Sequence, residues 1–243
     1  MKVAVVGAAG RMGRSVCEAV EGAGHDLVAR LDAGDPITAE SLAGADVVVE
    51  FTVPSATDAN VHAILDAGSH VVVGTTGWTE ERLEAVREHA VRVGKNAIIA
   101  PNYALSAVLA MSFAEKAAAM FESVEVIELH HPDKVDAPSG TATTSAQRIG
   151  AVRKEAGLAS PDATQSDPLG TRGGQIDGVH VHAVRLRGLY AHEEILLGNP
   201  GEQLTIRQDS FGRESFMPGV LLAVREVAGR PGLTYGLESL LNL

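Results

Sequence analysis

Near its N-terminus the chain reads VAVVGAAGRMGRSV at residues 3–16, and the fold can be worked out from this segment. The four apolar residues Val3–Val6 predict a short buried strand. Glycines then recur at every third position, Gly7, Gly10 and Gly13, in a G-x-x-G-x-x-G loop, and apolar residues at helical spacing follow. A strand, a glycine turn and a helix in this order predict the first unit of a parallel α/β sheet.

The same alternation continues through the first hundred residues, where short β-branched runs alternate with segments of helical periodicity. The predicted strands are Val3–Val6, Leu27–Leu31, Asp46–Phe51, Val71–Val73 and Ala97–Ala100, and the predicted helices are Arg11–Glu21, Ser55–Ala67 and Thr79–Val93. Apart from Arg30, Asp46 and Glu50, these strands are apolar, as a parallel sheet with both faces covered requires. The pattern therefore predicts a doubly wound α/β domain with a Rossmann-type parallel sheet.

The second half of the chain follows a different pattern. We expect a long helix, a strand, a histidine-rich loop and a second helix, followed by strands of an antiparallel or mixed sheet. These elements are expected at Leu105–Phe121, Val124–Leu129, from about Gly140, and at Val179–Arg187, Glu193–Leu197 and Gln203–Gln208, with a loop from Ala159 to Gly178. The pattern predicts an α+β domain with a mixed sheet.

The chain ends in a helical pattern, Glu214–Val227, and an apolar tail, Leu233–Leu243. Because an apolar tail needs a surface to cover it, we expect the tail to pack back on the first domain. The N-terminal domain is then discontinuous and consists of residues 1–102 and 213–243. Residues 103–212 form the inserted domain.

Composition excludes several classes of protein. Of 243 residues, 45% are hydrophobic and 26 are glycine, which excludes a disordered chain and a small disulfide scaffold. The net charge is −11 with no long Lys/Arg cluster, so no nucleic-acid partner is expected. A single cysteine, Cys17, and no signal-peptide pattern indicate a cytoplasmic protein. Glu115 and Lys116 interrupt the longest apolar segment, so we expect no transmembrane helix and no membrane partner.

The glycine loop is a variant of the dinucleotide-binding fingerprint, whose usual spacing is G-x-G-x-x-G. It lies between a predicted strand and helix, where free amides and the helix dipole can bind a pyrophosphate. Asp32 stands nineteen residues after Gly13, at the end of the second predicted strand, and can accept hydrogen bonds from ribose hydroxyls. A tight turn with an ordinary surface aspartate is the alternative. We favour a bound nicotinamide dinucleotide.

Two charges bear on which dinucleotide is bound. Asp32 repels a 2′-phosphate and Arg11 can attract one, so the sequence favours NADH and leaves NADPH open. Two further segments, Gly74-Thr75-Thr76-Gly77 and Ala100-Pro101-Asn102-Tyr103, follow predicted strands. Doubly wound sheets bind ligands at the carboxyl ends of their strands, so both segments are candidate cofactor contacts, with plain turns as the alternative.

A second candidate site is the segment HHPDKVDAPSGT from His130 to Thr141, directly after a predicted strand. It brings two imidazoles, an ammonium and a predicted helix start together. An imidazole can exchange a proton at neutral pH, and a lysine offers a cation or, when desolvated, an acid. Ser139 is a candidate N-cap, and the amides of Gly140 and Thr141 would form an anion pocket, most naturally for a carboxylate.

Other interpretations of these side chains remain open at this stage. His130 and His131 could belong to a metal site or to a solvated charged loop, but no Cys, His or Glu completes a ligand set, and we expect no metal. His180 and His182 share one face of a predicted strand, where hydrogen-bonded histidines are more common than metal ligands. Cys17 is more typical of a small core residue than of a nucleophile.

In four segments the chain resembles the 4-hydroxy-tetrahydrodipicolinate reductase (dihydrodipicolinate reductase) family of lysine and diaminopimelate biosynthesis. These segments are Gly7–Gly13, Gly74–Gly77, Ala100–Asn102 and Glu128–His131 with Lys134–Thr141. The resemblance covers nearly the whole chain, and the histidine-to-threonine segment is its most specific part. It implies a Rossmann-type domain completed by the C-terminal helices, and an inserted domain that binds substrate and builds a homotetramer. It also implies hydride transfer from NADH or NADPH to a small cyclic dicarboxylate.

The resemblance further implies roles for individual residues. His130 would be the general acid/base and Lys134 the proton donor, and His131, Lys134, Gly140 and Thr141 would hold the substrate carboxylates. The implied cofactor contacts are Gly7, Ala8, Ala9, Gly10, Arg11, Met12, Asp32, Gly74, Thr75, Thr76, Ala100, Pro101, Asn102 and Tyr103. Family members that favour NADPH often have an arginine directly after the acid of the second strand. Here Ala33 follows Asp32, so the resemblance does not imply a preference for NADPH.

Two other functions fit parts of the sequence. The chain could be another two-domain nicotinamide enzyme, such as an aspartate or sugar dehydrogenase, or a redox sensor that binds NAD(H) without turnover. A sensor needs an effector-binding face, and the sequence contains no helix-turn-helix or basic recognition helix. The reductase is the function that we favour.

Overall fold

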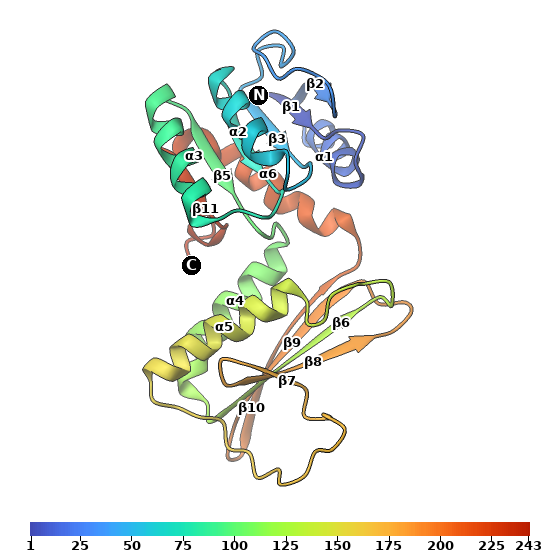
Figure 1. Ribbon diagram of the computed structural model, residues 1–243, viewed down its shortest axis with the longest axis vertical. Coiled ribbons are helices and arrows are strands. Elements are labelled where there is room, and N and C mark those ends of the chain that lie inside the picture. The colour runs from blue at the N-terminus through green and yellow to red at the C-terminus, as the bar shows by residue number, and fades with distance from the viewer. The chain divides into compact units, whose positions relative to one another are not determined.

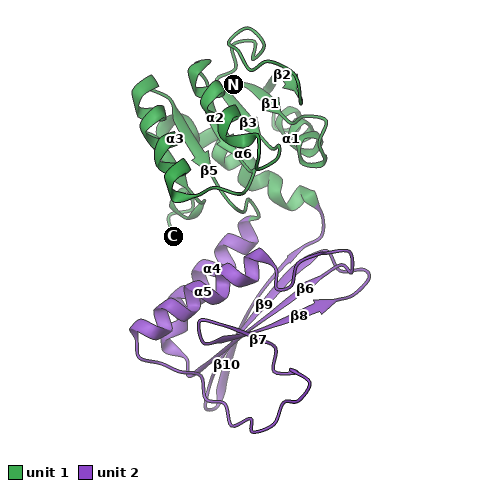
Figure 2. Cartoon of the chain, viewed as in Figure 1, with its two compact units in different colours: residues 1–104, 213–243 green, residues 105–212 purple.

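The computed structural model describes all residues from Met1 to Leu243, which form two compact units. Unit 1 consists of Met1–Ala104 and Arg213–Leu243, and unit 2 consists of Leu105–Gly212 (Figure 2). The chain therefore leaves unit 1, folds unit 2 as one continuous segment, and then returns to unit 1.

Unit 1 is built on a six-stranded parallel sheet in the order β11-β5-β4-β3-β1-β2 (Figure 1). Its strands are β1 Lys2–Val6, β2 Asp26–Leu31, β3 Val47–Glu50, β4 His70–Val73, β5 Asn96–Ile99 and β11 Gly232–Tyr235. Its helices are α1 Arg11–Gly22, α2 Thr57–Asp66, α3 Glu80–Val93 and α6 Met217–Glu226, with 3-10 turns at Arg213–Phe216, Val227–Gly229 and Glu238–Leu240. The predicted Rossmann-type sheet is confirmed.

Helices cover both faces of this sheet. Alternate strand residues such as Val48 and Val71 share one core with α2 and α3. The intervening residues, such as Val49 and Val72, are equally buried, and α1 packs against α6 near them. Burial on both faces explains why the central strands consist mainly of apolar residues.

The apolar tail packs on unit 1, as predicted, but it does so as a sixth strand that the sequence did not predict. Strand β11 pairs in parallel with β5, with Leu233 opposite Ala97. The Asn96 side chain donates to the carbonyls of Val227 and Ala228 and accepts from the amide of Gly232. One buried amide side chain thus ties the returning segment to β5.

Unit 2 contains a five-stranded mixed sheet in the order β10-β9-β6-β8-β7, in which β6 and β8 are parallel and the other pairs antiparallel. Its elements are α4 Leu105–Ala117, a 3-10 turn Ala118–Met120, β6 Ser123–His130, α5 Gly140–Glu155, β7 Gly174–Ile176, β8 Val179–Arg185, β9 Ala191–Asn199 and β10 Glu202–Ser210. Helices α4 and α5 share one core with the sheet (Figure 1). The predicted α+β domain with a mixed sheet is confirmed.

Several elements differ from the prediction in their boundaries, among them three in unit 2. The helix expected at Leu105–Phe121 ends at Ala117 and continues as a 3-10 turn. A short strand, β7, lies inside the segment expected to be loop. Strand β6 extends through His130, so this histidine is the last residue of a strand and its backbone is fixed by pairing to Ala191 and Arg185.

Candidate active site

The segment from His130 to Thr141 connects the end of β6 to the start of α5. Ser139 is the N-cap of α5, because its hydroxyl accepts a hydrogen bond from the amide of Ala142 at 3.2 Å. The prediction for Ser139 is confirmed. Gly140 and Thr141 form the first turn of the helix, where the positive end of the helix dipole favours a bound anion.

His130 is held by a buried carboxylate. Its Nδ1 lies 2.5 Å from Oε2 of Glu128, and only 13% of the side chain is exposed. Burial lowers the pKa of His130 below its usual range, although the hydrogen bond and charge of Glu128 oppose the shift. The imidazole is therefore a partly buried group whose neutral form is favoured at neutral pH.

The other predicted substrate-binding side chains lie on the loop that follows. Lys134 Nζ lies 2.7 Å from Oδ1 of Asp136, and the hydrogen bond from Lys134 lowers the pKa of the Asp136 carboxyl. The ring of His131 packs at 51° to the ring of Tyr190, with 6.3 Å between the centroids. The Lys134 ammonium thus pairs with an exposed carboxylate that a substrate carboxylate could replace.

Glu128 and Arg185 belong to this site although the sequence assigned neither a role. Glu128 is 0% exposed and accepts hydrogen bonds from both terminal nitrogens of Arg185, at 2.7 and 2.8 Å. The signal in the sequence is periodicity, because Glu128 occupies the same face of β6 as the core residues Val124 and Val126. An acid in that position of a strand needs fixed partners.

In unit 1 the glycine loop follows β1 with almost no free space around its backbone. Gly7 has φ +86°, and a Cβ added there would lie 2.1 Å from the carbonyl oxygen of Phe51. A Cβ on Gly13 would lie 2.0 Å from the carbonyl oxygen of Gly7. Only glycine allows this close turn, which places the amides at the start of α1 at the carboxyl edge of the sheet.

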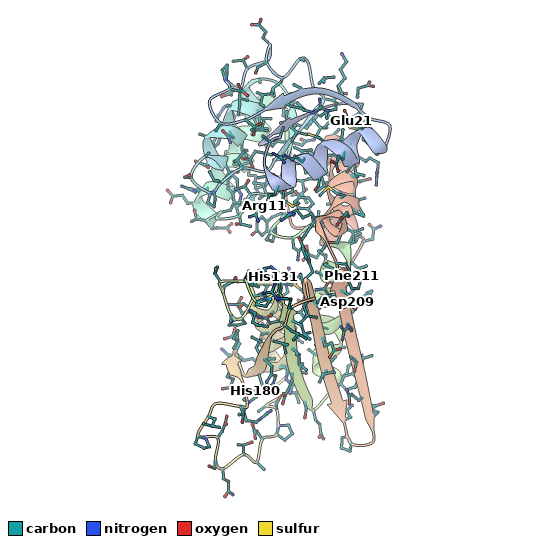
Figure 3. The ribbon with its side chains drawn as sticks, turned by 90° about the vertical axis from the view of Figure 1, so that its right-hand side faces the viewer. Arg11, Glu21, His131, His180, Asp209 and Phe211 are labelled. Carbon is teal, nitrogen blue, oxygen red and sulfur yellow. The ribbon has the colours of Figure 1, made fainter.

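Asp32 lies against this loop, as the dinucleotide interpretation requires. Its carboxylate oxygens accept hydrogen bonds from the amide of Ala9 at 2.9 and 3.1 Å. Arg11 is exposed at the first position of α1 (Figure 3). The glycine turn, the acid and the helix start together fit the pyrophosphate and ribose of a dinucleotide.

The two further predicted cofactor segments follow β4 and β5 at the same edge of the sheet. The Thr75 hydroxyl donates to Glu50 and accepts from the amide of Thr52, both at 2.7 Å, so this side chain is used in holding the turn. The Tyr103 hydroxyl donates to the carbonyl of Val73 at 2.8 Å, and its ring is only 2% exposed. Because the whole residue is this buried, the structure leaves little of Tyr103 open for the predicted cofactor contact.

The structure contains no group of three or more His, Cys, Asp or Glu side chains that could hold a metal ion. His182 Nε2 lies 2.7 Å from Glu125, and His180 Nε2 lies 3.4 Å from Asp162. Within unit 2, His180 and His131 lie toward opposite ends (Figure 3). The two strand histidines therefore do not belong to the site around His130.

None of the helices combines the length and the apolar composition that a bilayer span needs.

Comparison with known families covers almost the full chain. The family model "Dihydrodipicolinate reductase, N-terminus" matches residues 1–103, and "Dihydrodipicolinate reductase, C-terminus" matches residues 106–241. The chain belongs to the dihydrodipicolinate reductase family. The resemblance inferred from the sequence is confirmed.

Individual members of the dihydrodipicolinate reductase family are similar over their whole length. The 4-hydroxy-tetrahydrodipicolinate reductase of Beutenbergia cavernae is 60% identical over 247 residues, covering 100% of this chain and 99% of that relative. The enzyme of the same name from Bifidobacterium longum is 59% identical over 251 residues, covering 100% of both. A solved structure, the dipicolinate-bound dihydrodipicolinate reductase from Paenisporosarcina sp. TG-14, matches with a TM-score of 0.87 at 36% identity, covering 98% of each chain.

Proposed function

We propose that this chain reduces 4-hydroxy-tetrahydrodipicolinate to tetrahydrodipicolinate with NADH or NADPH, in lysine and diaminopimelate biosynthesis. The observation that carries the proposal is the full-length similarity to enzymes named for this reaction, at 60% identity in one relative. The segment from His130 to Thr141 supports it, because it combines proton-exchanging side chains with a capped helix start.

Unit 2, with residues 103–212 as the predicted domain, would bind the substrate. The helix start at Gly140 and Thr141 and the side chains of His131 and Lys134 would hold the two carboxylates, in a chain whose net charge of −11 otherwise repels them. His130 would act as general acid/base and Lys134 as proton donor to the reduced ring. These donors stabilise the charge that develops on the ring more than the charge of the ground state.

Unit 1 would bind the dinucleotide, which supplies the hydride. The residues proposed to hold it are the glycine loop with Arg11 and Met12, the acid Asp32, and the turns Gly74–Thr76 and Ala100–Tyr103. Asp32 favours NADH because its carboxylate lies at the loop that would bind the adenosine ribose. Arg11 is exposed at the start of α1 and permits use of NADPH as well.

We further propose a homotetramer in the cytoplasm. Strand residues such as Ile127, Leu129 and Leu196 alternate with the core residues of β6 and β9, so they lie on the face of the sheet that α4 and α5 do not cover. These three side chains are only partly buried and lie among polar residues such as Glu125 and His182, so a covering layer would bury apolar surface that the single chain leaves open. A second copy of the same face supplies one, which supports assembly through this sheet.

The test is a coupled assay that generates the substrate from pyruvate and aspartate semialdehyde and follows oxidation of NADH and NADPH in parallel. We expect turnover with the wild type, and a loss of about 10²-fold or more in kcat for His130→Gln and for Lys134→Ala. His182→Gln is the matched control, since His182 is also a strand histidine paired with a glutamate.

Dinucleotide binding, measured by fluorescence titration, should be unchanged in both variants. Wild-type turnover in either variant would refute the assigned roles. NADH oxidation that ignores the cyclic substrate but responds to an amino acid or a sugar would instead favour another two-domain dehydrogenase.

A further inference from the structure

A single buried ion pair holds the catalytic segment of unit 2 at three points. Glu128 binds the first residue of the segment through Nδ1 of His130, and it accepts a hydrogen bond at 3.1 Å from the amide of Ser139, the N-cap of α5. Arg185, on β8, binds Glu128 with both terminal nitrogens and also donates to the carbonyl of Asp136 at 2.7 Å. The start and end of the loop that carries Lys134 are therefore tied to the Glu128 carboxylate, and its middle is tied to Arg185.

The charge state of Glu128 follows from these contacts. Burial opposes ionisation of this carboxyl, but the hydrogen bonds from Arg185 and His130 outweigh burial and lower its pKa. A fully buried glutamate with donors on both oxygens remains an anion at neutral pH. An ionised carboxylate only accepts hydrogen bonds, so Nδ1 of the neutral His130 must carry the proton.

We propose that Glu128 is a positioning residue that fixes His130 in the Nδ1-protonated tautomer and leaves Nε2 as the nitrogen that exchanges a proton with substrate. Arg185 holds Glu128 in the orientation that this requires. The proposal rests on the role of His130 in the proposed function. In addition, Glu128 and Arg185 set the tautomer and orientation of the His130 imidazole before substrate binds.

The charged groups around His130 give the proposal a signature. They are Glu128 on its own strand, Arg185 on β8 and Lys134 on the loop, while its neighbour on β9 is the uncharged Ala191. Glu128 raises the pKa of His130, whereas Lys134 and Arg185 lower it. Removing Glu128 should therefore lower the pKa of His130, and removing Arg185 should raise it.

The same strand offers a matched control. Glu125, on the opposite face of β6, also binds a histidine and an arginine, with Oε2 2.7 Å from His182 and Oε1 2.7 Å from Arg172. Glu125→Gln removes the same kind of network without contacting His130. If the loss of a carboxylate network changed the pKa of His130 only by weakening the sheet, Glu125→Gln and Glu128→Gln would change it equally.

The experiment is a ¹⁵N and ¹H NMR titration of the histidine side chains in the unliganded full-length protein. In the wild type we expect neutral His130 to be protonated at Nδ1. Glu128→Gln should lower the pKa of His130, Arg185→Met should raise it, and Glu125→Gln should leave it unchanged. In the coupled assay, Glu128→Gln should lower kcat by about tenfold or more with little change in KM for the dinucleotide.

The proposal would be overturned if neutral His130 were protonated at Nε2. It would also be overturned if neither Glu128→Gln nor Arg185→Met changed the pKa of His130. If Glu128→Gln does not fold, the wild-type tautomer and the Arg185→Met titration still decide the question. Failure of the proposed function would appear separately, as absence of turnover in the wild type, because the NMR readout needs no substrate.

Discussion

Charged side chains beside the glycine loop bear on the proposed choice between NADH and NADPH. The Asp32 carboxylate accepts from the amide of Ala9, and the Asp32 amide donates to the carboxylate of Asp35 at 2.8 Å. Two acids therefore lie where a 2′-phosphate would add further negative charge. Arg11 is exposed at the start of α1, and its positive charge would instead attract a 2′-phosphate.

We expect Asp32→Asn to raise kcat/KM for NADPH and to lower it for NADH, changing the ratio by about tenfold. Arg11→Ala should lower kcat/KM for NADPH more than for NADH. Steady-state kinetics with both dinucleotides measures the two ratios. Asp26→Asn, at the other end of β2, is the matched control. Ratios equal to that of the wild type would contradict the assignment of the ribose site.

Between elements, a second buried acid joins strand β9 to helix α5. Glu193 lies opposite Glu128 in the β6–β9 register, is 2% exposed, and accepts a hydrogen bond from the Ser145 hydroxyl at 3.1 Å. Its other oxygen is buried without a hydrogen-bond partner. Burial, together with the negative charge of Glu128, raises the pKa of Glu193 to about 7. The carboxyl is thus mostly protonated under acidic conditions and ionises near neutrality.

This shift predicts how stability depends on pH. Between the ordinary glutamate pKa of 4.5 and about 7, the unfolded chain loses the Glu193 proton and the folded chain keeps it, so the free energy of unfolding falls as pH rises. The stabilising contribution of protonated Glu193 is complete below pH 4.5 and is lost above about pH 7. Glu193→Gln should reduce the stability difference between about pH 5 and about pH 8 by up to about 3 kcal/mol.

Urea unfolding at the two pH values measures the effect of Glu193→Gln. Glu194→Gln is the matched control, because this neighbour faces the other side of β9 and pairs with Arg207. An unchanged pH dependence in Glu193→Gln would show that Glu193 ionises at its ordinary pKa in the folded protein.

Local sequence patterns predicted those elements whose signals lie within a few residues. The glycine loop, the alternation of unit 1 and the N-cap Ser139 all have short-range signatures. Strand β11 was missed because four residues containing Gly232 and one leucine resemble a loop until β5 lies beside them. The Glu128–Arg185 pair joins residues 57 positions apart through the parallel pairing of β6 and β8, which no local pattern encodes.

For the molecule as a whole, the open face of the mixed sheet is where we expect copies of the chain to associate. Leu196→Arg places a charge on that face and should convert the proposed tetramer to smaller species. Sedimentation velocity measures the change. Val91→Arg, an exposed apolar position on α3, is the control and should leave the assembly intact. A Leu196→Arg variant with wild-type sedimentation would place the interface elsewhere.

The return of residues 213–243 to unit 1 sets an order on folding during synthesis. Unit 2 is continuous in sequence and can be completed while β5 still has an unpaired edge, since β11 has not yet left the ribosome. Until Asn96 gains its partners at Val227, Ala228 and Gly232, that edge is open to other strands. Nascent chains of this protein are therefore most exposed to mispairing, and to chaperones that prevent it, until residues 213–243 have been synthesised and β11 has paired with β5.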